Sequence, residues 1–216
     1  MFNFGLQRLY LCTPDRADLA SFIDACISGG VDIVQLREKN LDDRTIVERA
    51  RLARKVCAEH GVPFILNDRV DLAVEAGADG AHVGQDDMAP HQARKVLGTQ
   101  RLLGLSTHQP SELLASKSEP LDYISAGPVT ETPTKPGRAG TGPRYISFAA
   151  AHSKFPFFVT GGVCPESVPP LVQHGARRFV VVRWLTEASD PLDSARTLRT
   201  AIDRAIERVG DPARYS

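Results

Sequence analysis

Eight short apolar runs, rich in β-branched residues, alternate along the chain with segments that have helical spacing and charge. This alternation predicts a parallel sheet. The expected strands span residues 9–13, 32–37, 63–68, 80–84, 102–107, 123–127, 157–161 and 178–184. The expected helices span residues 18–29, 42–60, 70–76, 90–97, 111–118, 165–175 and 191–209. Eight β-α units in 216 residues predict an α/β fold, a short (β/α)8 TIM barrel, with residues 1–216 forming one compact domain.

Glycines mark the turns that lead from helices into strands. Gly30, Gly77 and Gly175 each stand two or three residues before an expected strand, as a repeated αβ turn requires. An open doubly wound sheet is the alternative, but no G-x-G-x-x-G loop follows the first expected strand. Residues 128–145 form one irregular stretch, and a loop this long in a compact chain is more often functional than idle. Residues 211–216 are expected to fray.

The charge balance excludes some classes of partner. Twenty-six Lys and Arg residues face 26 Asp and Glu residues, so the formal net charge is zero. Binding nucleic acid or anionic lipid over a broad face needs clustered surplus cations, so we expect neither a nucleic-acid nor a membrane partner. No apolar run approaches about 20 residues and no signal-peptide pattern is present, which predicts a cytoplasmic location. The sequence leaves a homo-oligomer open.

The four cysteines lack the spacing of a disulfide framework or a zinc site. They contain no C-x-x-C pair and have no nearby histidine at zinc-finger spacing. We therefore expect four free thiols. These cysteines are Cys12, Cys26, Cys57 and Cys164.

Polar side chains gather at the carboxyl ends of the expected strands, where a barrel builds its site. After the second strand, Gln35, Arg37 and Lys39 alternate along the chain and would point to one side if the chain stays extended. Asp68 follows the third strand, and two adjacent aspartates, Asp86 and Asp87, follow the fourth. Two carboxylates from these adjacent ends would suit Mg²⁺, although each alone also suits a helix cap or a turn.

The later strand ends carry hydroxyls, glycines and cations instead of carboxylates. Ser106 ends the fifth strand, and a loop with Thr130 and Lys135 follows the sixth. The glycines 161–162 follow the seventh strand, and Arg183 lies near the end of the eighth. Such groups suit phosphate, so we expect a site for two anionic groups.

Hydrolase motifs are missing from the sequence. It shows no Ser-His-Asp order, Cys-His pair or H-E-x-x-H motif. His82 lies inside the fourth expected strand. A role as a core histidine and a role as a catalytic histidine are both compatible with this position.

Six short segments, at the strand ends described above, together resemble the thiamine phosphate synthase family over residues 9–209. No single segment is specific, but six in order, each at an expected strand end, are. The matching segments are QLREK at 35–39, NDR at 67–69, HVGQDD at 82–87, GLSTH at 104–108, GPVTETPTK at 127–135 and GG at 161–162.

The resemblance implies a transferase of thiamine biosynthesis with Mg²⁺ as its cofactor. Such an enzyme couples 4-amino-2-methyl-5-pyrimidinylmethyl diphosphate with 4-methyl-5-(2-phosphoethyl)thiazole by dissociative displacement, giving thiamine phosphate and diphosphate. The implied binders of the pyrimidine diphosphate are Gln35, Leu36, Arg37, Glu38, Lys39, Asn67, Ser106 and Lys135, with Arg37, Lys39, Ser106 and Lys135 as the catalytic residues. The implied metal ligands are Asp68 and Asp87, and the implied thiazole phosphate binders are Thr132, Pro133, Thr134, Gly162, Val182 and Arg183.

Arg183 departs from the pattern of the resembled family, in which many members carry a small hydroxyl residue there. An inward Arg183 would bind phosphate as a cation, and an outward one would leave only the main chain of Val182. Two other functions compete: a related thiazole tautomerase-type barrel isomerase and a non-catalytic barrel that binds phosphorylated metabolites.

Overall fold

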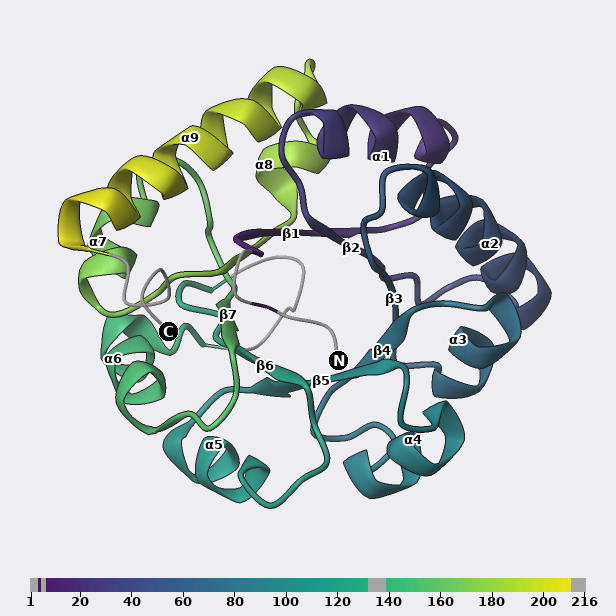
Figure 1. Ribbon diagram of the computed structural model, residues 1–216, viewed down its shortest axis with the longest axis horizontal. Coiled ribbons are helices and arrows are strands. Elements are labelled where there is room, and N and C mark those ends of the chain that lie inside the picture. The colour runs from purple at the N-terminus through teal and green to yellow at the C-terminus, as the bar shows by residue number, and fades with distance from the viewer. Residues whose placement is uncertain (1–3, 5–6, 132–138, 211–216) are drawn as a thin grey trace.

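The computed structural model describes residues 4, 7–131 and 139–210, and its strands form a closed barrel in the order β1 to β8. Every neighbouring pair is parallel, and β1 pairs with β8 to close the ring. The helices surround this ring (Figure 1). The prediction of a (β/α)8 barrel is confirmed. The strands are β1 (Leu9–Thr13), β2 (Ile33–Leu36), β3 (Phe64–Asn67), β4 (Gly80–Val83), β5 (Leu102–Thr107), β6 (Tyr123–Ala126), β7 (Phe157–Val159) and β8 (Phe179–Val181).

The helices follow the strands at the predicted places, with two additions. They are α1 (Leu19–Ser28), α2 (Asp43–Glu59), α3 (Val70–Ala76), α4 (Pro90–Leu97), α5 (Pro110–Ser116), α6 (Gly142–His152), α7 (Val168–Gln173), α8 (Arg183–Thr186) and α9 (Pro191–Val209). Residues 142–145 of the expected irregular stretch belong to α6, which was not predicted. The expected eighth strand is too long, because the chain turns into α8 at Arg183.

Two apolar layers hold the barrel together. An outer layer fills the space between the strands and the helices, and the outward residues of β1 and β2, such as Leu11 and Leu36, belong to it. A smaller inner layer fills the base of the barrel with aromatic rings. Tyr10, Tyr123 and Phe158 pack there, with ring centroids between 5.3 and 6.0 Å apart. Because this layer closes the base, polar side chains of the same strands are left to face the opposite mouth.

Aspartates in the turns before even-numbered strands fix the start of the preceding odd-numbered strands. The Asp32 carboxylate accepts the N–H groups of Arg8 and Leu9, at 2.8 and 3.1 Å. The Asp79 carboxylate accepts the N–H of Phe64 at 2.9 Å, and the Asp122 carboxylate accepts that of Leu103 at 2.8 Å. Two of the three glycine turns, those at Gly30 and Gly77, therefore hold an aspartate that accepts a main-chain N–H of the preceding strand. The turn before β6 makes the same hydrogen bond through Asp122.

Among the described residues, no helix is both long enough and apolar enough to span a lipid bilayer.

Candidate active site

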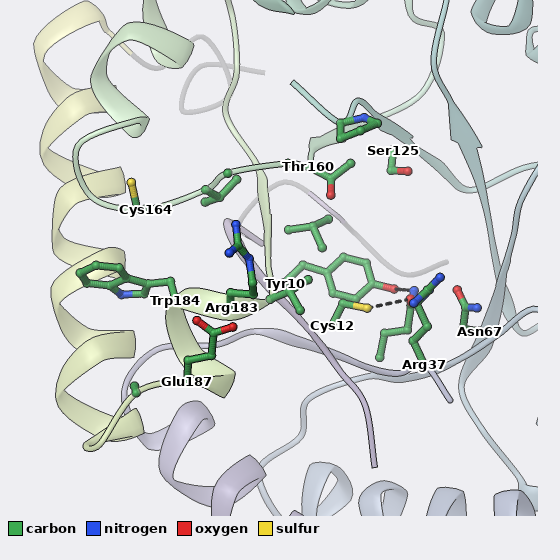
Figure 2. Close-up of a pocket in the computed structure, with 18 of the residues that line it drawn as sticks. Tyr10, Cys12, Arg37, Asn67, Ser125, Thr160, Cys164, Arg183, Trp184 and Glu187 are labelled. Atoms are coloured by element: carbon green, nitrogen blue, oxygen red, sulfur yellow. Dashed lines mark hydrogen bonds between the residues drawn. The ribbon is translucent and has the colours of Figure 1, made fainter. Parts of the chain in front are cut away.

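A cavity of about 630 Å³ opens where the strands end at the carboxyl mouth of the barrel. Strand ends and loops from around the barrel line it. Figure 2 shows Arg37 and Asn67 at one end of the cavity and Cys164 and Trp184 at the other, with Tyr10 between them. Its size and its mixture of polar and apolar walls suit a small-molecule site.

The end of β2 divides its residues between the cavity and the outer core. Gln35 and Arg37 line the cavity, whereas Leu36 points outward and is fully buried. The Glu38 carboxylate is taken up by the loop, since it accepts the N–H groups of Asp15, Lys39 and Asn40. Burial opposes the effect, but these hydrogen bonds lower the pKa of Glu38. A contact between a substrate and Leu36 or Glu38 would therefore involve the main chain.

Asp68 and Asp87 bring two carboxylates together at the ends of β3 and β4. Asp68 has a φ of 58°, an uncommon conformation for a residue with a side chain. The Lys39 ammonium lies 3.2 Å from its carboxylate. Burial and the neighbouring Asp87 carboxylate raise the pKa of Asp68. Asp87 also accepts the N–H of Gly84 at 2.7 Å, which fixes one of its oxygens.

A row of polar side chains crosses the barrel between its aromatic base and the cavity. The Gln35 amide donates to the Tyr10 hydroxyl at 2.6 Å, and the hydroxyl oxygens of Tyr10 and Tyr123 are 3.0 Å apart. His82 Nδ1 lies 3.1 Å from the Tyr123 oxygen, and His82 Nε2 lies 3.0 Å from Ser106 Oγ. His82 is thus a buried histidine with polar partners, and it also lines the cavity. It combines the burial expected of a core histidine with the position expected of a site histidine.

Part of the opposite wall of the cavity is exposed backbone, at Gly161 and Gly162. Gly161 and Gly162 both have positive φ, 97° and 72°. A Cβ at Gly161 would lie 2.6 Å from the Val129 nitrogen, so a side chain has no room there. Thr160 holds this wall to the loop after β6, because its carbonyl accepts the Val129 N–H at 2.8 Å. Exposed main chain of this kind suits an anion such as phosphate.

Arg183 lines the cavity from the first residue of α8 and is otherwise exposed. This position agrees with the inward-facing Arg183, and not with the outward-facing one, of the two alternatives given by the sequence. Val182 precedes it and also lines the cavity. Thr132, Pro133, Thr134 and Lys135, which complete the sequence-predicted site, lie outside the described residues.

A family model described as thiamine monophosphate synthase matches residues 9–185. The chain belongs to this family. A thiamine-phosphate synthase from Thermobifida fusca is 45% identical over 198 residues, which cover 89% of this chain and 90% of that protein. A second, from Mycolicibacterium smegmatis, is 41% identical over 215 residues, covering 93% and 95%.

Other family members differ from this chain in length or in sequence. The thiamine-phosphate synthase from Nostoc punctiforme is 43% identical over 92% of this chain, but the chain spans only 56% of that protein. Among solved structures, thiamine phosphate pyrophosphorylase from Pyrococcus furiosus superposes with a TM-score of 0.87 over 94% of this chain and all of its own, at 24% identity. This likeness shows that the two chains share a fold.

The residues of this thiamine monophosphate synthase family member fit Mg²⁺. Mg²⁺ prefers oxygen ligands and usually takes one or two carboxylates together with water and substrate phosphates. Asp68 and Asp87 offer such a pair, and the raised pKa of Asp68 marks a place where added positive charge is favourable. No cluster of three or more His, Cys, Asp or Glu suited to a metal occurs among the described residues. Water and substrate phosphate oxygens would complete the coordination.

Several residues that line the cavity of this family member were not predicted as site residues. Tyr10, Cys12, Ser125 and Thr160 come from within or just after strands, and Trp184 comes from α8. A signal was present for some of them. Tyr10 and Cys12 alternate with fully buried leucines in β1, and such alternation separates the barrel interior from the outer core.

Proposed function

We propose that the chain is a thiamine-phosphate synthase, which couples the pyrimidinylmethyl diphosphate with the thiazole phosphate and releases diphosphate. Family membership and one geometric observation support this function. One cavity has Gln35, Arg37 and Asn67 at one side and the Gly161–Gly162 backbone with Arg183 at the other. The Asp68–Asp87 pair does not line the cavity itself, but Asp68 directly follows Asn67 at the first of these sides. These two sides match two phosphorylated substrates, one bound through cations and a metal, the other through main chain and a guanidinium.

Asp68 and Asp87 would hold Mg²⁺ beside the diphosphate. The bound ion would neutralise negative charge on the leaving group. Arg37 would donate paired hydrogen bonds to phosphate oxygens, for which the planar guanidinium is suited. Lys39 is an exposed side chain within reach of Asp68, and it would add a second cation at the same end. The predicted role of Lys135 at the diphosphate is part of the same proposal.

The reaction needs no nucleophile from the protein. The bond between the pyrimidinyl methylene carbon and the diphosphate oxygen breaks, and its electron pair leaves with the diphosphate. The electron-rich aminopyrimidine stabilises the positive methylene carbon, and the thiazole nitrogen then donates its lone pair to that carbon. The protein positions the two substrates and stabilises the departing charge. This requirement agrees with a cavity lined by Arg37, Arg183 and several hydroxyl groups.

The decisive experiment mixes the protein with both substrates and Mg²⁺ and follows thiamine phosphate by chromatography. Product is expected with Mg²⁺ and is expected to disappear when EDTA is added, then return with excess Mg²⁺. A parallel reaction with the thiazole phosphate alone tests for an isomerase. Absence of thiamine phosphate, combined with isomerised thiazole or with binding alone, would overturn the proposal. A homo-oligomeric state and a cytoplasmic location stay predictions.

A further inference from the structure

Five side chains from five strands form one continuous hydrogen-bonded row beneath the cavity. The row comprises Gln35, Tyr10, Tyr123, His82 and Ser106, joined at 2.6, 3.0, 3.1 and 3.0 Å in that order. Gln35 and Ser106, at its ends, line the cavity, whereas Tyr123 is fully buried and does not. The row therefore connects two substrate-facing residues through a residue that no substrate touches.

The number of donor protons in the row determines which atom donates and which accepts in each of its hydrogen bonds. The Gln35 amide donates to the Tyr10 hydroxyl, which has the Tyr123 hydroxyl as its other partner among the described residues. The Tyr10 proton finds an acceptor when it points to the Tyr123 oxygen, and we assign this direction to the bond. Tyr123 then has its proton left for Nδ1 of His82. Burial raises the pKa of both phenols, so both keep their protons. A neutral imidazole that accepts at Nδ1 carries its proton on Nε2, and that proton faces Ser106 Oγ.

We propose that Tyr123 is a positioning residue that holds His82 as the neutral Nε2–H tautomer and thereby turns the Ser106 hydroxyl proton toward the cavity. Ser106 Oγ accepts from His82 and also from the Ser125 hydroxyl, at 3.4 Å. With both lone pairs engaged, the hydroxyl acts outward as a donor. Ser106 thus selects a substrate group with a free lone pair. On the proposed function, on which this last step rests, that group belongs to the pyrimidine diphosphate.

The barrel has a glycine at the position where this row needs space. Gly104 in β5 is the register partner of His82 on one side and of Tyr123 on the other. A Cβ at Gly104 would lie 2.2 Å from the Tyr123 ring and 2.4 Å from His82 Nδ1. The two rings can meet across β5 only because residue 104 has no side chain. This clearance is a second, independent feature that serves the contact between His82 and Tyr123.

The test reads the tautomer of His82 directly, by ¹⁵N-histidine labelling and long-range ¹H–¹⁵N NMR of the free protein. The His82 signals are assigned as those absent from His82→Gln. The wild type is expected to show one Nε2–H tautomer, and Tyr123→Phe is expected to show a mixture. Tyr145→Phe is the matched control, because Tyr145 is also buried and its hydroxyl donates to Thr107 at 2.8 Å, outside the row.

Steady-state kinetics supply the second readout. Tyr123→Phe is expected to raise KM for the pyrimidine diphosphate roughly 2- to 10-fold, the range for one neutral hydrogen bond, with KM for the thiazole phosphate unchanged. Tyr145→Phe should change neither KM. A wild-type His82 protonated at Nδ1, or an unchanged tautomer in a folded Tyr123→Phe, would overturn the inference. If the wild type makes no thiamine phosphate, the proposed function fails, and the tautomer measurement still decides the roles of Tyr123 and His82.

Discussion

The Lys39 ammonium lies 3.2 Å from the Asp68 carboxylate, so a cation already occupies the place beside the carboxylate pair at the barrel mouth. Asp68 directly follows β3 and has a φ of 58°, and Lys39 lies in the loop after β2. A metal at Asp68 and Asp87 would compete with Lys39 for the carboxylate. Lys39 would then turn to the diphosphate, so metal binding and substrate binding involve the same ammonium group.

Replacing Asp68 by Asn should weaken Mg²⁺ activation. We expect the Mg²⁺ concentration for half-maximal activity to rise by roughly 10- to 100-fold, because one charged oxygen ligand is lost. Asp86→Asn is the matched control, since Asp86 is the exposed neighbour of Asp87 but is not the carboxylate that acts on Asp68. Equal Mg²⁺ titration curves for the two variants would contradict the metal assignment.

Replacing Arg183 by Met should weaken binding of the thiazole phosphate. Methionine keeps much of the apolar stem and removes the guanidinium, so the loss reports on charge and hydrogen bonding. We expect KM for the thiazole phosphate to rise about 10-fold, with KM for the pyrimidine diphosphate within about 2-fold of wild type. Glu187→Gln, one turn further along the same cavity wall, is the control for local disturbance. A change in KM for the pyrimidine diphosphate alone would show that Arg183 serves the other substrate.

Thiol labelling should separate the cysteines into two pairs. Burial raises the pKa of both Cys26 and Cys57 to about 12. At pH 8 only about one in 10⁴ of these thiols is ionised, and labelling needs the thiolate, so both should stay unlabelled until the protein unfolds. Cys12 and Cys164 line the cavity.

Mass spectrometry after short labelling at pH 8 should therefore find adducts first at Cys164, which is half-buried, and more slowly at Cys12, which lines the cavity but is buried. Both substrates with Mg²⁺ should slow the formation of both adducts. Cys164→Ser identifies the contribution of the half-buried thiol. Rapid labelling of Cys26 in the native protein would contradict its buried position.

Replacing Asp32 by Ala should destabilise the barrel. The Asp32 carboxylate accepts two main-chain N–H groups and pairs with Arg199 at 2.9 Å. We expect the free energy of unfolding, measured in urea, to fall by about 2–3 kcal/mol, because buried donors lose their acceptor. Asp203→Ala removes the other, more exposed partner of Arg199 and should cost about 0.5 kcal/mol or less. Equal losses in the two variants would show that the main-chain hydrogen bonds contribute little.

The barrel was predictable from sequence because its signals are local. Short apolar runs, glycine turns and polar strand ends each occupy a few residues, and the strand ends predicted Gln35 and Arg37 in the cavity. Helix α6 was missed because the Pro-, Thr- and Gly-rich stretch before it hides where the helix begins. The eighth strand was drawn too long because Val182 continues the apolar run and Trp184 follows closely. In the structure Trp184 belongs to α8, and its indole N–H donates to the Ser194 carbonyl of α9.

The row beneath the cavity could not be predicted in the same way. His82 and Tyr123 are 41 positions apart and meet only because β4, β5 and β6 are in a register that puts Gly104 between them. Sequence alternation gives the side of a strand on which a residue lies but not its height in the barrel. Whether His82 was a core or a catalytic residue was therefore open until the register was known.

The aspartate turns join neighbouring strands through hydrogen bonds between residues that are close in the sequence. Asp32, Asp79 and Asp122 reach back only 23 or 24, 15 and 19 positions to the strands whose first N–H groups they accept. Each also returns its own main-chain N–H to a carbonyl of the same odd-numbered strand. A strand, its helix and the next strand can thus lock together before the rest of the chain is available, which keeps the entropy cost of each step small. Three of the four strand pairs have this short-range closure, whereas the turn before β8 has Arg177 at the matching position, two residues after its glycine.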